Sequence, residues 1–137
     1  NGPGGAPQRV MTVLVVDDSE PVREFMKAAL ARYRINPVQA QSGEEALVKL
    51  LDRNFDVVFL DVVMTGLDGY EVCRQIKSKK GASPTKVVML TSKDGAFDRI
   101  RGALAGCDAY LGKPVDESRL NALLKRYAAE LSVSISA

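Results

Sequence analysis

The sequence predicts an α/β fold, in which a doubly wound parallel sheet of five strands carries helices on both faces. Two observations support this prediction. Short runs of β-branched and other apolar residues occur five times along the chain, and a segment with helical apolar spacing or capping residues follows each run. Five such units in succession require parallel strands, because each helix has to cross back over the sheet before the next strand begins.

The first two units occupy the N-terminal half of the chain. Residues 13–16 (VLVV) have the composition of a strand that is buried on both faces. Apolar side chains then recur at helical spacing, at Val22, Phe25, Met26, Ala29, Leu30 and Tyr33. Residues 37–40 predict a weaker strand. The stretch 42–45 (SGEE) is a capping box that opens a second helix, which we expect to continue to about Arg53.

The remaining three units follow the same pattern. Residues 57–60 and 87–90 predict strongly buried strands, and residues 109–111 predict a short fifth strand. A third helix is expected from Gly69 to about Lys80, closed by Gly81. The apolar residues that mark the last two helices are Phe97, Ile100 and Leu104, before an end near Gly106, and Leu120, Leu123, Leu124, Tyr127 and Leu131. Right-handed crossovers then favour the flavodoxin-like strand order 2-1-3-4-5.

Length and composition indicate one ordinary globular domain. The 137 residues contain 46% hydrophobic and 26% charged residues. We expect residues 1–10, which are rich in Gly and Pro, to form a flexible lead-in or a cloning remnant, residues 11–131 to form the domain, and residues 132–137 to form a flexible tail. A net charge of +2 with interspersed signs predicts neither nucleic acid nor an anionic membrane as a partner of this domain.

The residue inventory narrows the chemistry. The chain has no histidine, which excludes Ser-His-Asp and Cys-His triads and histidine metal sites from its own residues. Cys73 and Cys107 form no CxxC motif and predict buried, inert thiols. No apolar run reaches the ~20 residues of a membrane span and no signal-peptide pattern is present, so a cytoplasmic location is expected.

Polar side chains follow four of the five predicted strands. Asp17 and Asp18 come after the first strand, Asp61 after the third, Thr91 after the fourth and Lys113 after the fifth. In strand order 2-1-3-4-5, the carboxyl ends of these strands meet at one edge, where such sheets bind ligands. Each residue alone has an ordinary explanation as a helix cap or a surface side chain. Together the five residues indicate one site around Asp61.

Three carboxylates at one place repel each other, by about 1–4 kcal/mol for a pair ~4 Å apart, depending on the effective dielectric constant. A divalent cation converts this repulsion into binding. Oxygen ligands without His or Cys favour Mg²⁺ over Zn²⁺. The metal also neutralises the charge that otherwise keeps an anionic phosphoryl donor away from a carboxylate. The sequence therefore predicts a Mg²⁺ site.

In these residues the chain resembles the receiver domains of two-component response regulators, including chemotaxis-type regulators. The matching pieces are Asp17-Asp18, Asp61, Gly66-x-Asp68-Gly69, Thr91-Ser92 and Tyr110-x-x-Lys113-Pro114. The resemblance covers about residues 12 to 128. Each motif is weak alone, but their order on five strand–helix units is specific.

The resemblance implies a role for each matching residue. Asp61 is then the phosphorylated nucleophile, and Mg²⁺ is bound by Asp17, Asp18, Asp61 and the backbone carbonyl of Val63. Lys113 pairs with Asp61 and the phosphoryl oxygens across a cis Lys113-Pro114 bond. Thr91 and Tyr110 are the switch residues that move on phosphorylation.

The resemblance also implies a signalling function. The domain accepts a phosphoryl group from a histidine kinase or a histidine phosphotransfer protein, loses it slowly by its own catalysis, and presents a surface of helix 4, strand 5 and helix 5. That surface signals to a downstream protein or to an output domain missing from this chain. The loop 92–98 with residues 106–110 is similar to pilus- and twitching-type regulators.

Three other functions have to be weighed. An aspartyl-nucleophile hydrolase needs Asp-x-Asp after the first strand, and a flavin-binding module needs a Ser/Thr-rich phosphate loop there; Asp17-Asp18 fits neither. A pseudo-receiver that is not phosphorylated and acts only as a protein docking module remains open. The intact set of acidic residues argues against it without proving turnover.

Overall fold

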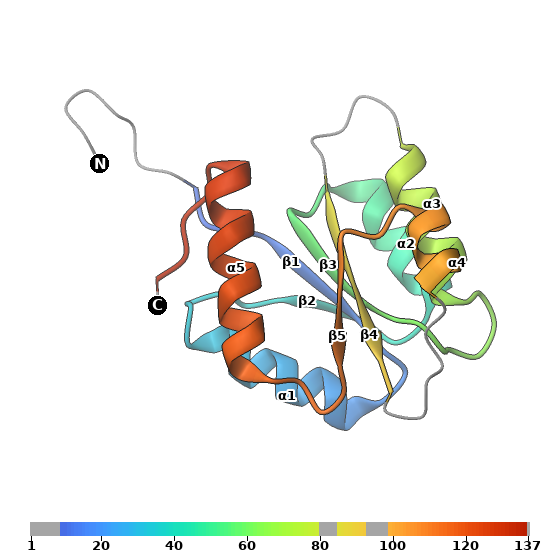
Figure 1. The fold of residues 1–137 in the computed structure, drawn as a ribbon, viewed down its shortest axis with the longest axis horizontal. Helices are drawn as coiled ribbons and strands as arrows, with labels where there is room; N and C mark the ends of the chain where they lie inside the picture. Colours follow the sequence, from blue (N-terminus) through green and yellow to red (C-terminus); the bar gives the residue numbers. More distant parts are fainter. Residues whose placement is uncertain (1–8, 80–84, 93–98, 137) are drawn as a thin grey trace.

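The computed structural model describes residues 9–79, 85–92 and 99–136, and it confirms the predicted fold class. One parallel sheet has the strand order β2-β1-β3-β4-β5 (Figure 1). The strands are β1 (Val13–Val16), β2 (Val38–Ala40), β3 (Val57–Asp61), β4 (Lys86–Thr91) and β5 (Ala109–Gly112). The helices are α1 (Glu20–Ala31), α2 (Gly43–Asp52), α3 (Gly69–Ser78), α4 (Arg99–Ala105) and α5 (Glu117–Leu131).

The sheet separates two apolar layers. Helices α1 and α5 lie on one face, and α2, α3 and α4 lie on the other (Figure 1). Alternate side chains of each central strand enter opposite layers, so that Val57 and Phe59 pack towards α1 and α5 while Val58 and Leu60 pack towards α2 and α3. All residues of β1 and β3 are buried, as the continuous apolar runs predicted.

Side-chain caps fix where the helices begin. The Ser42 hydroxyl accepts a hydrogen bond from the Glu45 amide at 3.0 Å, and the Glu45 carboxylate accepts one from the Gln41 amide at 2.8 Å. This pair confirms the capping box. Ser19, Asp68 and Asp116 cap α1, α3 and α5 in the same way. The helices α1, α2, α3 and α5 therefore each start at a defined distance from the strand before them.

Three apolar residues face solvent where helical spacing predicted a buried face. Phe25 on α1 is 40% exposed, and Ile100 and Leu104 on α4 are 73% and 80% exposed. Helix α4 instead buries the small residues Gly102 and Ala105, which let it approach the layer below closely. Phe97 and Gly81, also used in the sequence prediction, lie outside the described residues.

The two ends of the described chain lie together at the N-terminal edge of the sheet (Figure 1). Val10 and Ser134 form a parallel β-bridge, the Met11 amide donates to the Ser134 carbonyl at 3.1 Å, and Val133 is buried. The small, polar composition of residues 132–137 does not predict these contacts. Across the described parts of the chain, no helix combines the length and apolar character needed to cross a membrane.

Asp56, directly before β3, is a buried acid with several partners. Its carboxylate accepts hydrogen bonds from the Arg9 guanidinium at 2.7 and 2.6 Å and from the amide and hydroxyl of Thr12 at 2.7 and 3.1 Å. Burial raises the pKa of Asp56, but these hydrogen bonds outweigh burial and hold the pKa below its ordinary value. Asp56 thereby joins the start of β3 to the segment before β1.

We expect Asp56→Ala to lower the free energy of unfolding by about 2 kcal/mol, because the Thr12 amide loses its buried acceptor. Since the folded-state pKa of Asp56 is lowered, its contribution is fully present above about pH 4, the ordinary value, and is lost as the pH falls through the folded-state pKa. Urea unfolding at pH 7 and pH 3 measures both effects. Asp52→Ala, at an exposed position on α2, is the control, and equal losses in both variants would contradict the prediction.

Candidate functional site

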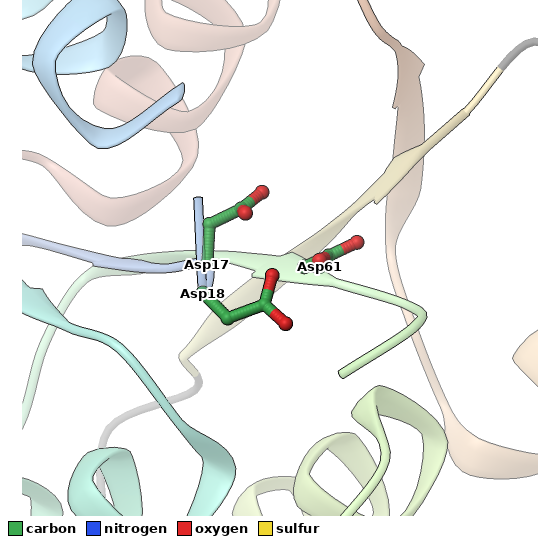
Figure 2. Close-up of side chains that lie close together, drawn as sticks. All are labelled: Asp17, Asp18 and Asp61. Atoms are coloured by element: carbon green, nitrogen blue, oxygen red, sulfur yellow. The ribbon is translucent and has the colours of Figure 1, made fainter. Parts of the chain in front are cut away.

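Three carboxylates gather at the carboxyl ends of β1 and β3. Asp61 is the last residue of β3, and Asp17 and Asp18 follow β1 directly. Because Val16 pairs with Leu60 in the sheet register, the next residues of the two strands lie beside each other. One oxygen from each of the three carboxylates lies within 4.8 Å of the others (Figure 2). Asp17 is fully buried and Asp61 is 5% exposed, whereas Asp18 is open to solvent.

Lys113 brings a positive charge to this cluster from the other side. Its Nζ lies 3.1 Å from Asp17 Oδ2 and 3.2 Å from Asp61 Oδ1. The Lys113 amide donates to the Thr91 carbonyl at 2.7 Å, and the Lys113-Pro114 peptide bond is cis, as expected. The family resemblance implied the pairing with Asp61; the structure shows that Asp17 shares the same ammonium group.

Two groups of this site, Asp61 and Lys113, have raised pKa values. Desolvation and the neighbouring charge of Asp17 raise the pKa of Asp61 to about 6, against the opposing effect of Lys113. Burial lowers the pKa of Lys113, but the charges of Asp61 and Asp17 outweigh it and raise that pKa. Asp61 is therefore an anion at neutral pH, held in an environment that disfavours its charge.

The donor set fits a divalent, oxygen-binding cation. Three carboxylates and one ammonium group leave two uncompensated negative charges at neutral pH, which a divalent ion neutralises. The side-chain atoms that could bind a metal are all carboxylate oxygens. Because one of the three carboxylates is exposed, a bound metal would keep open coordination positions for water or substrate oxygens. This combination suits Mg²⁺, which retains waters and uses few carboxylates.

The other predicted site residues lie around this cluster. Val63 is 59% exposed, and its amide donates to Asp61 Oδ1 at 3.3 Å. Thr91 ends β4, is buried, and its hydroxyl donates to the Leu111 carbonyl at 3.4 Å. Tyr110 on β5 is half-buried, and the Arg99 guanidinium lies over its ring, 4.6 Å from the ring centroid. Thus Asp17, Asp18, Asp61 and Lys113 form the centre, and Thr91 and Tyr110 occupy the neighbouring strands.

Gly69 is needed for the backbone to close behind Asp61. A Cβ atom at Gly69 would lie 2.3 Å from the Asp61 carbonyl oxygen and 2.9 Å from the Val62 Cα. No side chain fits there without moving the strand that carries Asp61. Gly69 also starts α3, so its close contact fixes the helix against the end of β3.

A comparison with protein-family models matches residues 13–125 to the response regulator receiver domain. This match covers most of the chain and includes each residue of the acidic cluster. The chain belongs to the response regulator receiver domain family. The conclusion confirms the resemblance that the order of motifs indicated in the sequence.

Curated relatives agree with this assignment. The receiver domain is 36% identical to protein PilG of Pseudomonas aeruginosa over 117 residues, which cover 85% of this chain and 87% of PilG. It is 41% identical to the transcriptional regulatory protein ResD of Bacillus subtilis over 118 residues, or 83% of this chain and 48% of ResD. The chain thus spans most of PilG and about half the length of ResD.

Solved structures share the fold. A response regulator from Chloroflexus aurantiacus is 30% identical with a TM-score of 0.81, covering 88% of this chain and 99% of that one. The chemotaxis protein CheY4 of Vibrio cholerae is 29% identical with a TM-score of 0.77, covering 86% and 98%. The receiver domain of the sensor histidine kinase PA1611 from Pseudomonas aeruginosa, 23% identical with a TM-score of 0.78 and coverage of 88% and 98%, is described with a magnesium ion in its active-site cleft.

The structure adds residues that the sequence did not point to. The Arg23 guanidinium donates to the Asp17 carbonyl at 2.6 Å and so ties α1 to the end of β1. Arg99 stacks on Tyr110, as described above. Arginines are common on exposed helix faces, so neither position gave a signal; only the strand order and the helix phase bring them to these contacts.

We expect Asp61→Asn to make the metal-free receiver domain more stable at neutral pH. Because the folded-state pKa of Asp61 is raised from about 4 to about 6, ionisation costs the folded protein stability, and the cost grows as the pH rises through this window. The gain should be roughly 2–3 kcal/mol above pH 7 and small below pH 4. Urea unfolding in EDTA across this range measures it. A constant difference at all pH values would contradict the assignment, and Asp52→Asn is the control.

Proposed function

We propose that this receiver domain is a phosphorylation-activated switch in which Asp61 accepts a phosphoryl group in a Mg²⁺-dependent reaction. One observation carries the proposal: a nearly buried carboxylate ends the central strand, with an ammonium group 3.2 Å away and two further carboxylates beside it. This arrangement supplies both a nucleophile and the charges that an incoming phosphoryl group needs.

The reaction is an in-line displacement at phosphorus. A carboxylate oxygen of Asp61 attacks the phosphorus of a phosphohistidine, the P–N bond breaks, and the released imidazole nitrogen takes a proton from solvent. The product is a mixed anhydride of Asp61 and phosphate. Lys113 stabilises negative charge on the phosphoryl oxygens, because its ammonium group already lies beside the attacking carboxylate.

Asp18 and Asp61 would hold Mg²⁺ directly and Asp17 directly or through water, together with the backbone carbonyl of Val63. When bound, the ion neutralises carboxylate and phosphoryl charge at the reacting centre. The convergence of the three carboxylates supports this set, and the magnesium ion described for the PA1611 receiver domain supports the choice of metal.

The output lies on the face formed by α4, β5 and α5. Phosphorylation adds about −1.5 to −2 charges and strong acceptors, which attract the Thr91 hydroxyl away from the Leu111 carbonyl. Tyr110 follows Thr91, and α4 moves with the ring that Arg99 contacts. The exposed Ile100 and Leu104 give α4 an apolar surface for a downstream partner, and Leu104 borders the hollow between α4 and the α3 residues Tyr70 and Arg74.

Membership of the receiver family implies that the phosphoryl donor is a histidine kinase or a histidine phosphotransfer protein, and these 137 residues contain no histidine of their own to supply the group. The signal then passes to a partner protein or to an attached output domain. Because this chain covers most of PilG, that similarity favours signalling to a separate partner protein. Because it covers only about half of ResD, the second similarity is compatible with an attached output domain.

Incubation with acetyl phosphate and Mg²⁺ should add the mass of one phosphoryl group to the intact protein. Asp61→Asn should abolish the gain, because the amide is not a nucleophile, whereas Asp52→Asn should retain it. Hydroxylamine should release the phosphoryl group as phosphate and leave the much smaller mass gain of a hydroxamate at Asp61, as expected for an acyl phosphate and not for a phosphoserine. Mass spectrometry of the intact chain measures all three results.

The alternative is a pseudo-receiver that uses the same α4 surface without phosphotransfer, and the exposed Ile100 and Leu104 would serve it equally well. Absence of a mass gain in the wild type, together with absence of Mg²⁺ binding, would replace our proposal with this one. A mass gain that persists in Asp61→Asn would place the acceptor elsewhere.

Magnesium should raise the thermal unfolding midpoint of the wild type. A ligand that binds only the folded state at a hundredfold excess over its Kd adds about 2.7 kcal/mol to the free energy of unfolding. Asp18→Asn should remove most of this shift at little cost in folding, because Asp18 is exposed. Differential scanning fluorimetry with and without Mg²⁺ measures the shift. An Asp18→Asn protein that responds like Asp52→Asn would show that Asp18 is not a ligand.

A further inference from the structure

The loop from Val62 to Asp68 connects β3 to α3 and carries Val63. Backbone hydrogen bonds hold both ends of this loop: the Val62 amide donates to the Leu90 carbonyl and the Gly69 amide donates to the Val62 carbonyl, each at 3.1 Å. The loop begins at the proposed phosphorylation site, so its path sets where the Val63 carbonyl lies relative to Asp61.

Glu44 of α2 contacts the middle of this loop. Its Oε2 atom accepts a hydrogen bond from the Leu67 amide at 3.2 Å, across 23 residues of chain. The same carboxylate lies against Gly66, where a Cβ atom would be 3.0 Å from Oε2. Gly66 has a φ of +82°, a left-handed conformation that turns the chain towards Glu44. Two successive loop residues are therefore shaped around one side chain.

The start of α2 is built to leave Glu44 available for this contact. Capping of the helix is carried out by its neighbours, since Ser42 accepts from the Glu45 amide and Glu45 accepts from the Gln41 amide. Gly43 completes the contact, because a Cβ there would lie 2.9 Å from the Leu67 carbonyl oxygen. The two consecutive glutamates thus have different tasks: Glu45 caps its own helix, and Glu44 holds the loop.

We propose that Glu44 is a positioning residue for Mg²⁺ binding, acting through the loop that presents the Val63 carbonyl. This inference rests on the proposed function of the acidic cluster. The connection to the site runs along the loop, from Leu67, which Glu44 holds, to Val63, whose amide donates to Asp61 Oδ1 at 3.3 Å. A loop that shifts at Leu67 displaces Val63, and with it both the carbonyl ligand and one hydrogen bond that orients the Asp61 carboxylate.

The charge of Glu44 is a separate effect that the experiment has to distinguish from its hydrogen bond. A carboxylate at this position also makes the surroundings of the site more negative, which favours a cation at longer range. Glu44→Gln removes the charge but keeps a carbonyl oxygen that can accept from the Leu67 amide. Glu44→Ala removes both the charge and the acceptor.

Calorimetric titration of the full chain with Mg²⁺ tests the proposal. Glu44→Ala should weaken Mg²⁺ binding by about fivefold, below the roughly 10–100-fold typical of residues that directly support a metal ligand. Glu44→Gln should stay within about twofold of the wild type, by the same reasoning that its acceptor is retained. Glu45→Ala, which disturbs the cap of the same helix, should also bind Mg²⁺ like the wild type.

A second measurement needs no metal. Amide hydrogen exchange at Leu67 in EDTA should be faster in Glu44→Ala than in Glu44→Gln and the wild type, because only the alanine variant loses the acceptor. Unchanged Mg²⁺ affinity in Glu44→Ala, or equal weakening in Glu44→Ala and Glu44→Gln, would overturn the positioning role. Wild-type protein that binds no Mg²⁺ would instead overturn the proposed function itself, so the two failures are distinguishable.

Discussion

The ion pairs of Lys113 with Asp17 and Asp61 are the interaction on which the candidate site depends. They join the carboxyl ends of β1, β3 and β5, and they keep two buried carboxylates of like charge near each other. Without the ammonium group, burial and mutual repulsion would both act against the charged form of the acids. The parallel sheet makes this pairing possible, because its strand order brings three separate strand ends to one edge.

Strand β3 has a buried aspartate at each end of its apolar run, and the two have opposite environments. Asp56, before the strand, accepts hydrogen bonds from Arg9 and Thr12, and its pKa is lowered. Asp61, at the end of the strand, shares a single ammonium with a second acid, and its pKa is raised. The first acid stabilises the fold. The second retains unsatisfied charge, which the proposed cation binding and phosphotransfer both require.

Much of the fold and the centre of the site could be predicted from the sequence, because both depend on local patterns and one topological rule. Buried parallel strands appear as continuous apolar runs, and strand order then places Asp17, Asp61 and Lys113 together. The prediction of which face of α4 is buried was wrong. This seven-residue helix packs through Gly102 and Ala105, so its large apolar residues do not mark its buried side.

Contacts between distant segments left no trace in the sequence. Arg9 belongs to a Gly- and Pro-rich stretch that resembled a flexible lead-in, and its partner Asp56 lies 47 residues away. In the sequence, Glu44 was only one residue of the predicted capping box 42–45, and the residue pattern did not distinguish its role from that of Glu45. Such roles depend on how a helix is rotated and on how close a loop passes, which apolar periodicity does not encode.

The bridge between Val10 and Ser134 has a consequence for how this domain can be coupled to anything fused to it. Both ends of the described chain, near Val10 and Ser134, lie at the N-terminal edge of the sheet, while the acidic cluster lies at its carboxyl edge, roughly 15 Å away along strands of four or five residues at 3.3 Å per residue. A neighbour attached by a short tether at either end is thus held away from the acidic pocket. Such a neighbour can instead respond to movement along the flank of the domain.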